Sequence, residues 1–284
     1  MKLCIDFGEP LEKLGLQGAA KAVKAAGFDG VDFPFKEKKA RKLLECEHWR
    51  ENARRIRQTL DENGLACAQA HAPYGFSGTE KPDETSEKFR LIARSFEFAA
   101  ILGAKIVVVH AVSDIKPVDF LPFNLRFYKA LEKYAKAQGI KIGVENIYRF
   151  DQKFHRFDGV FETSEKMTSF LQKLRSNTFT ACLDTGHAKL TGTAPEKYIL
   201  GMNASNLGAL HLHDNDGVDD LHALPMTGVL DWGAILAALK RIGYRGDLTF
   251  ELPYYFGGFS AEELPDGLLI AGGVAKAFQE KLLS

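Results

Sequence analysis

The sequence has few cysteines and no paired cysteine motif. Four cysteines are scattered through 284 residues, and none stands in a CxxC pair. This spacing excludes a small disulfide-stabilised scaffold and a thiolate zinc finger. The chain begins MKLCIDFG, which enters a strand-like run at once and leaves no room for a signal peptide. We therefore expect buried thiols and a cytoplasmic location.

The chain also lacks an excess of one charge and a long apolar run. Its 37 basic residues balance 37 acidic residues, so nothing in the overall charge attracts nucleic acid or an anionic membrane. No apolar segment is long enough to cross a bilayer. We expect neither nucleic acid nor a membrane to be a partner.

Strand-like and helix-like segments alternate along the whole chain. Short apolar runs are each followed by a longer segment with helical periodicity, such as 85–102, 120–138 or 232–242. No Gly-rich dinucleotide loop follows the first strand, which argues against a doubly wound open sheet. The pattern predicts an α/β protein with a single domain over 1–284, a (β/α)8 TIM barrel. The eight predicted strands are 2–8, 30–35, 66–74, 105–111, 141–147, 179–188, 208–214 and 247–253.

Glycine and aspartate supply the expected helix ends. Asp231 precedes the segment 232–242 and is a plausible N-cap. Glycine tolerates the left-handed conformation that ends many helices. The glycines expected in this role are Gly27, Gly64, Gly103, Gly139 and Gly243.

Ionisable residues concentrate at the carboxyl ends of the predicted strands, where the active sites of such barrels form. Six of the eight histidines lie there. So many buried ionisable groups would be costly if unpaired. A divalent cation removes that cost, because carboxylates and neutral imidazoles are its ligands. The pattern therefore predicts a metal site among six histidines and three carboxylates: His71, His110, Glu145, Asp184, His187, His211, His213, His222 and Glu251.

The stretch HLHDNDGVDDLH, residues 211–222, carries the densest group. His213 is the ligand-like residue at the strand end, and Asp220 and His222 lie in the following loop, within reach of the same mouth. Asp214 and Asp216 belong to a turn-like composition, so we expect them to form a turn and be solvated.

Several ordered motifs resemble the xylose isomerase-like TIM barrel superfamily, which contains sugar isomerases and epimerases together with endonuclease IV. The motifs are VENI (144–147), CLDTGHA (182–188), HLHDNDG (211–217), DLHALPMTGVLDW (220–232) and FELP (250–253).

The ketose 3-epimerase type within that superfamily implies one divalent ion, Mn²⁺, Zn²⁺, Co²⁺ or Mg²⁺. The resemblance assigns its ligands to Glu145, Asp184, His213 and Glu251. It also implies that His187 contacts substrate, and it places Asp151 at an acidic position of the family, where those enzymes have glutamate. The family's arginine after the strand-seven histidine has no counterpart in this loop.

The endonuclease IV pattern implies a larger set, with nine ligands for three zinc ions. Against that alternative stand the motif HLHDNDG, which departs from the nuclease-like H-x-N-D-S-K, and the balanced charge. A sugar dehydratase and a non-catalytic binding barrel also remain open. The nine candidates are His71, His110, Glu145, Asp184, His187, His213, Asp220, His222 and Glu251.

An isomerase or epimerase has to move a proton on the carbon beside a carbonyl group. Glu145 and Glu251 are the predicted catalytic pair, one removing the proton and the other returning it through an enediolate. The expected partner is a small sugar or sugar phosphate. Tyr254 begins an aromatic loop that would serve as a lid or a dimer contact, so a homo-oligomer stays open. The aromatic residues that would wall the sugar are Phe7, Phe33, Phe35, Tyr74, Phe76 and Tyr254.

Overall fold

Eight parallel strands form one sheet that closes on itself. The computed structural model describes residues 1–151 and 156–284, with side chains for all of these except residues 150, 151 and 156–158. The strand order is β10-β1-β2-β3-β4-β5-β8-β9, and a bridge between Leu212 and Phe250 joins the last strand to the first. This closure confirms the predicted TIM barrel. The strands are β1 (Leu3–Asp6), β2 (Gly30–Pro34), β3 (Ala66–His71), β4 (Ile106–Val109), β5 (Lys141–Glu145), β8 (Phe179–Asp184), β9 (Leu207–His211) and β10 (Leu248–Phe250).

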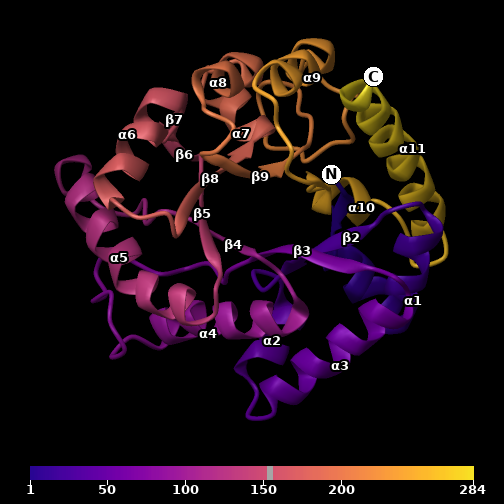
Figure 1. Ribbon diagram of the computed structural model, residues 1–284, viewed down its shortest axis with the longest axis horizontal. Helices are drawn as coiled ribbons and strands as arrows, with labels where there is room; N and C mark the ends of the chain where they lie inside the picture. Colours follow the sequence, from indigo (N-terminus) through magenta and orange to yellow (C-terminus); the bar gives the residue numbers. More distant parts are fainter. Residues whose placement is uncertain (152–155) are drawn as a thin grey trace.

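Helices surround the barrel as an outer ring (Figure 1). The expected caps are present. Asp231 accepts a hydrogen bond from Ala234 N at 2.9 Å, and Gly27, Gly64, Gly103, Gly139 and Gly243 all have positive φ. The helices are α1 (Gly8–Ala25), α2 (Lys38–Glu45), α3 (Trp49–Glu62), α4 (Glu87–Leu102), α5 (Pro117–Ala137), α6 (Ser164–Leu174), α7 (Thr185–Leu190), α8 (Pro195–Gly201), α9 (Trp232–Arg241), α10 (Pro253–Gly257) and α11 (Leu264–Leu283).

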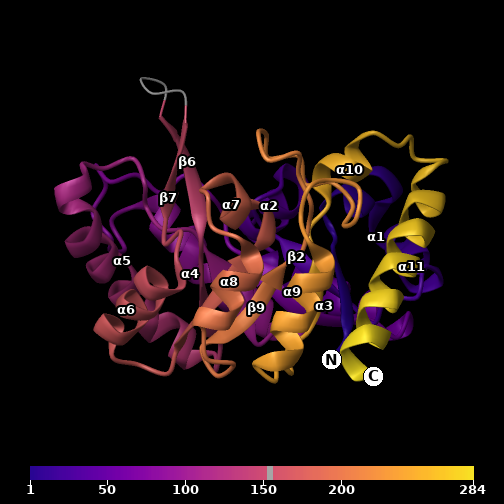
Figure 2. The ribbon, with the colours of Figure 1, turned by 90° about the horizontal axis from the view of Figure 1, so that it is seen from above.

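An antiparallel hairpin that the sequence did not predict follows β5. It consists of β6 (Ile147–Asp151) and β7 (Arg156–Val160), which pair from Ile147 with Val160 to Asp151 with Arg156. Figure 2 shows the hairpin rising from the barrel on the side away from both chain ends. The predicted strand 141–147 therefore merges the end of β5 with the start of β6.

Several predicted strands run past the observed strand ends. The prediction 66–74 ends three residues beyond β3, and 179–188 includes the start of α7. The excess holds Tyr74 in the first case and His187 in the second, and both line the cavity at the mouth. The mouth residues thus sit on strand ends and the loops that follow them.

The apolar core has a large outer part and a small inner part. Phenylalanines such as Phe33, Phe96 and Phe98 are fully buried in the main cluster, where helices pack on strands. A separate small cluster contains Val108, Cys182 and Ala209. No helix among the described residues has both the length and the apolar character to cross a membrane.

Candidate metal centre

Among the side chains that the structure describes, those of metal-ligand type gather in three groups at the carboxyl ends of the strands. Within each group, one donor atom per residue lies within 4.8 Å of the others, and Glu145 belongs to two groups. The first group is His71, His110 and Glu145, the second is Glu145, Asp184, His211 and Glu251, and the third is His187, His213, Asp220 and His222.

His211 occupies the centre of the second group. Its Nδ1 atom lies 3.1 Å from Glu145 Oε1 and 3.2 Å from Glu251 Oε2. Its Nε2 atom lies 3.3 Å from Asp32 Oδ2. A carboxylate behind a histidine fixes the ring and raises its basicity, as in many metal centres.

Grouped by distance, His211 lies with Glu145, Asp184 and Glu251, whereas the predicted ligand His213 lies in the third group. The strand β9 ends at His211, and His213 lies two residues further along; both rings are fully buried. His213 Nε2 is 2.9 Å from both carboxylate oxygens of Asp184, but its ring stacks on His222 with 3.8 Å between centroids. The four predicted ligands are therefore divided between two adjacent groups.

Four histidines direct the same ring atom at carboxylates. In each, Nδ1 lies near a backbone carbonyl, which can only accept, so Nδ1 carries the hydrogen. The distances are 2.9 Å for His71 to Ala72 O, 3.0 Å for His187 to Asn146 O, 3.4 Å for His213 to Asp214 O and 3.1 Å for His222 to Glu251 O. The opposite atom, Nε2, faces Glu145, Asp220, Asp184 and Asp220 respectively.

A neutral imidazole in this tautomer turns the lone pair of Nε2 toward carboxylate oxygens. Such an arrangement is repulsive unless a proton or a metal cation lies between the two atoms. Protonation of every ring would stack two cations at His213 and His222. His110 Nε2 is 3.0 Å from Glu145 Oε2 but has no hydrogen-bond partner. Positive charge therefore has to lie between these rings and the carboxylates; a proton supplies it at His187 when no metal is bound, and divalent cations accept the same imidazole and carboxylate ligands.

Local backbone structure holds the ligands in place. Asp184 ends β8 and caps α7, because its Oδ1 accepts from His187 N at 2.7 Å. Asn146 ties the neighbouring strand to it through Asp184 N at 2.8 Å and Asp184 O at 2.9 Å. Gly186 is required, since a Cβ atom there would lie 2.1 Å from the His213 ring. The CLDTGHA segment is thus shaped around one imidazole.

Asp214 is buried, and the prediction of a solvated turn residue is wrong for it. Its carboxylate accepts from Met226 N and Leu230 N at 3.1 Å each and from Trp232 Nε1 at 2.8 Å. These donors come from the far end of the loop that carries Asp220 and His222. Asp216 is exposed and accepts from Val218 N, as expected of a turn. The turn-like composition did not reveal that Asp214 anchors the loop.

Electrostatic interactions in the mouth shift several pKa values. Burial alone would raise the pKa of Glu145, but His211 and His110 outweigh it and hold that pKa well below its usual range. For Glu251, His211 and Lys36 outweigh burial in the same way, and its pKa is also held low. Burial would lower the pKa of His187, but Asp184 and Asp220 raise it to about 10. In the protein without metal, Glu145 and Glu251 are therefore charged.

Three charged residues of the mouth escaped the sequence analysis. Lys36, which follows β2, forms an ion pair with Glu251. Asp6 and Asp32 end or interrupt the apolar strands β1 and β2, and both are almost fully buried. The sequence signal that could have revealed them is an isolated charged residue within an apolar run. A charged residue is buried in a barrel interior only if it has partners there.

A cavity of about 360 Å³ opens above the three groups. Tyr74, Tyr148 and Tyr254 line it, together with residues of all three groups. The other predicted aromatic residues lie in the core instead; Phe33 packs on Phe98, for example, with 5.9 Å between ring centroids. Asp151 ends β6, but its side chain is outside the part that the structure describes.

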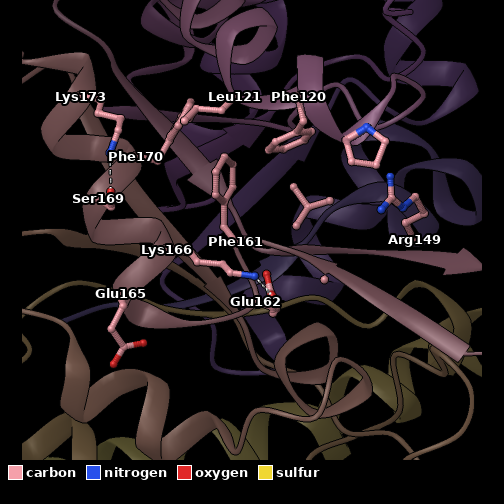
Figure 3. A pocket seen from close by; sticks show the side chains of 13 residues that line it. Phe120, Leu121, Arg149, Phe161, Glu162, Glu165, Lys166, Ser169, Phe170 and Lys173 are labelled. Carbon is pink, nitrogen blue, oxygen red and sulfur yellow. Dashed lines mark hydrogen bonds and ion pairs between the residues drawn. The ribbon is translucent and has the colours of Figure 1, made fainter.

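A second cavity, of about 480 Å³, lies between the start of α5, the hairpin and α6 (Figure 3). Phe120, Leu121 and Phe170 give it an apolar wall, and Lys166 turns toward Glu162. It contains no member of the three groups. The chemistry of the barrel is therefore concentrated in the smaller cavity at the mouth.

Comparisons with known proteins identify the family and the fold. The profile of the xylose isomerase-like TIM barrel family matches residues 20–269. L-ribulose 3-epimerase of Methylomonas sp. strain DH-1 is 25% identical over 251 residues, which cover 82% of this chain and 78% of the relative.

Two solved structures share the fold. A D-tagatose 3-epimerase-like protein has a TM-score of 0.75 at 22% identity, covering 99% of this chain and 97% of its own. The IolI protein with a bound zinc atom has a TM-score of 0.75 at 19% identity, covering 97% and 98%.

Proposed function

Because the chain belongs to the xylose isomerase-like TIM barrel family, we propose that it is a divalent-metal-dependent isomerase or epimerase of sugars or sugar phosphates. One observation carries the proposal. Four histidines fix their Nδ1 hydrogens on backbone carbonyls and point Nε2 at buried carboxylates. Cations satisfy that arrangement, and they do so at the mouth of a barrel, where a small substrate can enter.

The second group is the proposed principal site, held by Glu145, Asp184, His211 and Glu251, with His213 beside Asp184. A divalent cation there would supply charge stabilisation for the oxygens of an enediolate. Mn²⁺, Zn²⁺, Co²⁺ and Mg²⁺ all accept carboxylate and imidazole ligands, and the histidine-rich third group favours zinc.

Glu145 and Glu251 are the proposed proton-transfer pair. Both approach the same atom, His211 Nδ1, from different strands, so each presents a charged oxygen close to the centre of the mouth. Their lowered pKa values keep them ionised, so either can take the proton from carbon, and the other returns a proton that it has first drawn from solvent in the mouth. Tyr74 and Tyr254 would contact the sugar from the rim.

The test is deuterium exchange at carbon. The metal-loaded protein is incubated in D₂O with L-ribulose, D-tagatose and their phosphates, and NMR follows the carbon beside the carbonyl. We expect one deuteron in a new epimer or isomer, and none after chelation. Absence of exchange with every ketose and aldose tried, while metal stays bound, would contradict the proposal.

A second candidate, a multi-metal phosphodiesterase, is favoured by the presence of two further ligand groups beside the principal one. Bridged ions 3.5–4 Å apart, roughly, are typical of phosphate hydrolysis. Hydrolysis of bis(p-nitrophenyl) phosphate by the zinc-loaded protein, without any carbon exchange, would favour this candidate.

A further inference from the structure

Lys36 is a buried cation in a mouth built to hold cations. It follows β2, and only 5% of its side chain is exposed. Among the described residues that line the mouth cavity, it is the one lysine or arginine. Its ammonium forms an ion pair with Glu251 Oε1 and lies 3.7 Å from Asp6 Oδ2.

The two oxygens of Glu251 are divided between different partners. Oε2 lies 3.2 Å from His211 Nδ1, on the side of the second group, whereas Oε1 is held by Lys36. Both oxygens could face the second group only if Oε1 left the lysine. The lysine is itself held from behind, because Asp6 is fixed by a hydrogen bond from Gly8 N to Oδ1 at 2.7 Å.

We propose that Lys36 is a positioning residue that keeps Glu251 a one-oxygen ligand. This inference rests on the proposed function, and it explains why a buried lysine lies beside Glu251. Holding Oε1 away leaves room at the second group for an oxygen of the substrate. The positive charge also weakens cation binding, since like charges at this distance repel in a buried site.

The test measures cobalt affinity and visible absorption in the intact chain. Metal is removed by chelation, and Co²⁺ is returned in competition with a chelator of known affinity. We expect Lys36→Met to bind Co²⁺ at least about tenfold more tightly, with weaker visible absorption because the coordination number rises. Lys36→Arg keeps the charge and should resemble the wild type in affinity.

Activity gives a second readout where the wild type turns over a sugar. Lys36→Met should lower kcat by about 100-fold, although its metal affinity rises. If Lys36 had only a structural role, Lys36→Met would lower both kcat and metal affinity. Lys39→Met is the matched control, because Lys39 Nζ donates to Leu11 O at 3.1 Å, away from the mouth, and should change neither quantity.

The outcomes separate the two proposals. Unchanged or weaker Co²⁺ binding by Lys36→Met, with the melting temperature retained, would overturn the role of Lys36. If that variant does not fold, Lys36→Gln removes the charge in a similar volume and carries the same affinity prediction. If Lys36→Met binds Co²⁺ more tightly but the wild type turns over no sugar, the positioning role of Lys36 is supported and the proposed function is contradicted.

Discussion

The mouth of the barrel and the layer between strands and helices are equally buried but chemically opposite. In the layer, Phe33, Phe35 and Phe98 have no exposed surface and satisfy one another by contact alone. In the mouth, Asp184 and His213 are just as buried. There, however, the lone pair on His213 Nε2 faces the lone pairs of the Asp184 carboxylate oxygens. The layer is complete as it stands, whereas the mouth has three groups of side chains that could hold metal ions.

This contrast teaches which substitutions should affect stability and which should affect chemistry. A change in the layer removes packing and leaves the ligands where they are. A change in the mouth removes a ligand or its anchor, and its effect on folding is smaller than its effect on metal content.

Glu145→Gln should have the largest effect. Glu145 contacts His211 through Oε1, and His71 and His110 through Oε2, at 3.0–3.3 Å, so it serves two groups at once. We expect turnover to fall at least about 1,000-fold, metal content to fall, and the circular dichroism spectrum to be unchanged. Glu251→Gln should behave similarly. Near wild-type activity in either variant would show that the proton-transfer assignment is wrong.

Phe98→Ala should lower the stability of the fold and leave the metal content unchanged. Phe98 packs against Phe35 at 4.9 Å and Trp49 at 6.2 Å between ring centroids. The free energy of unfolding should fall by about 3–5 kcal/mol, measured by urea denaturation, while metal per folded chain stays the same. Loss of metal from the folded variant would mean that the two regions are not separable.

Asp214→Ala should moderately lower both the stability of the fold and the metal content. The buried donors Met226 N, Leu230 N and Trp232 Nε1 would lose their acceptor, which we expect to cost about 3 kcal/mol. The loop would loosen, and metal held by Asp220 and His222 should be lost first. Asp216→Ala is the control, because Asp216 is exposed, and its melting temperature should not change. Equal effects of the two substitutions would contradict the anchoring role.

Asp6→Asn should give the smallest change, and one that depends on pH. Burial raises the pKa of Asp6 from 3.8 to about 6, although Lys36 opposes the shift. The folded state therefore favours the protonated acid. Its stabilising contribution is full below pH 4 and is lost as the pH rises through 6. We expect Asp6→Asn to be more stable than the wild type by about 2–3 kcal/mol at pH 8, and equally stable at pH 4. Lower stability at pH 8 would show that the ion pair with Lys36 dominates.

The barrel was predictable because its signals are local. Apolar runs, glycines after helices and Asp231 as a cap each follow from a few neighbouring residues, and the structure confirms them. The hairpin after β5 was missed because the predicted strand 141–147 took in only Ile147, although the segment Ile147–Asp151 forms a separate strand. Sequence period does not show where one strand stops and another starts.

The mouth was predictable as a region but not in its detailed contacts. Strand ends in a barrel converge, so the six histidines and three carboxylates were expected to meet. His211 and His213 are two residues apart and share a face, so the sequence pattern cannot distinguish which of them lies nearer to Glu145 and Glu251. Lys36 and Asp214 depend on contacts with residues 215 and 18 positions away, Glu251 and Trp232, which no local pattern encodes.

The most direct test of the metal centre is elemental analysis of the chain purified without added metal or chelating resin. We predict at least one tightly bound divalent ion per chain, and loss of metal in Glu145→Gln. Two or three zinc ions would mean that the first and third groups are also filled and would make phosphodiesters the next substrates to test. A chain that contains no metal and takes up none when Mn²⁺, Zn²⁺ or Co²⁺ is added would contradict the metal centre, and with it the proposed function.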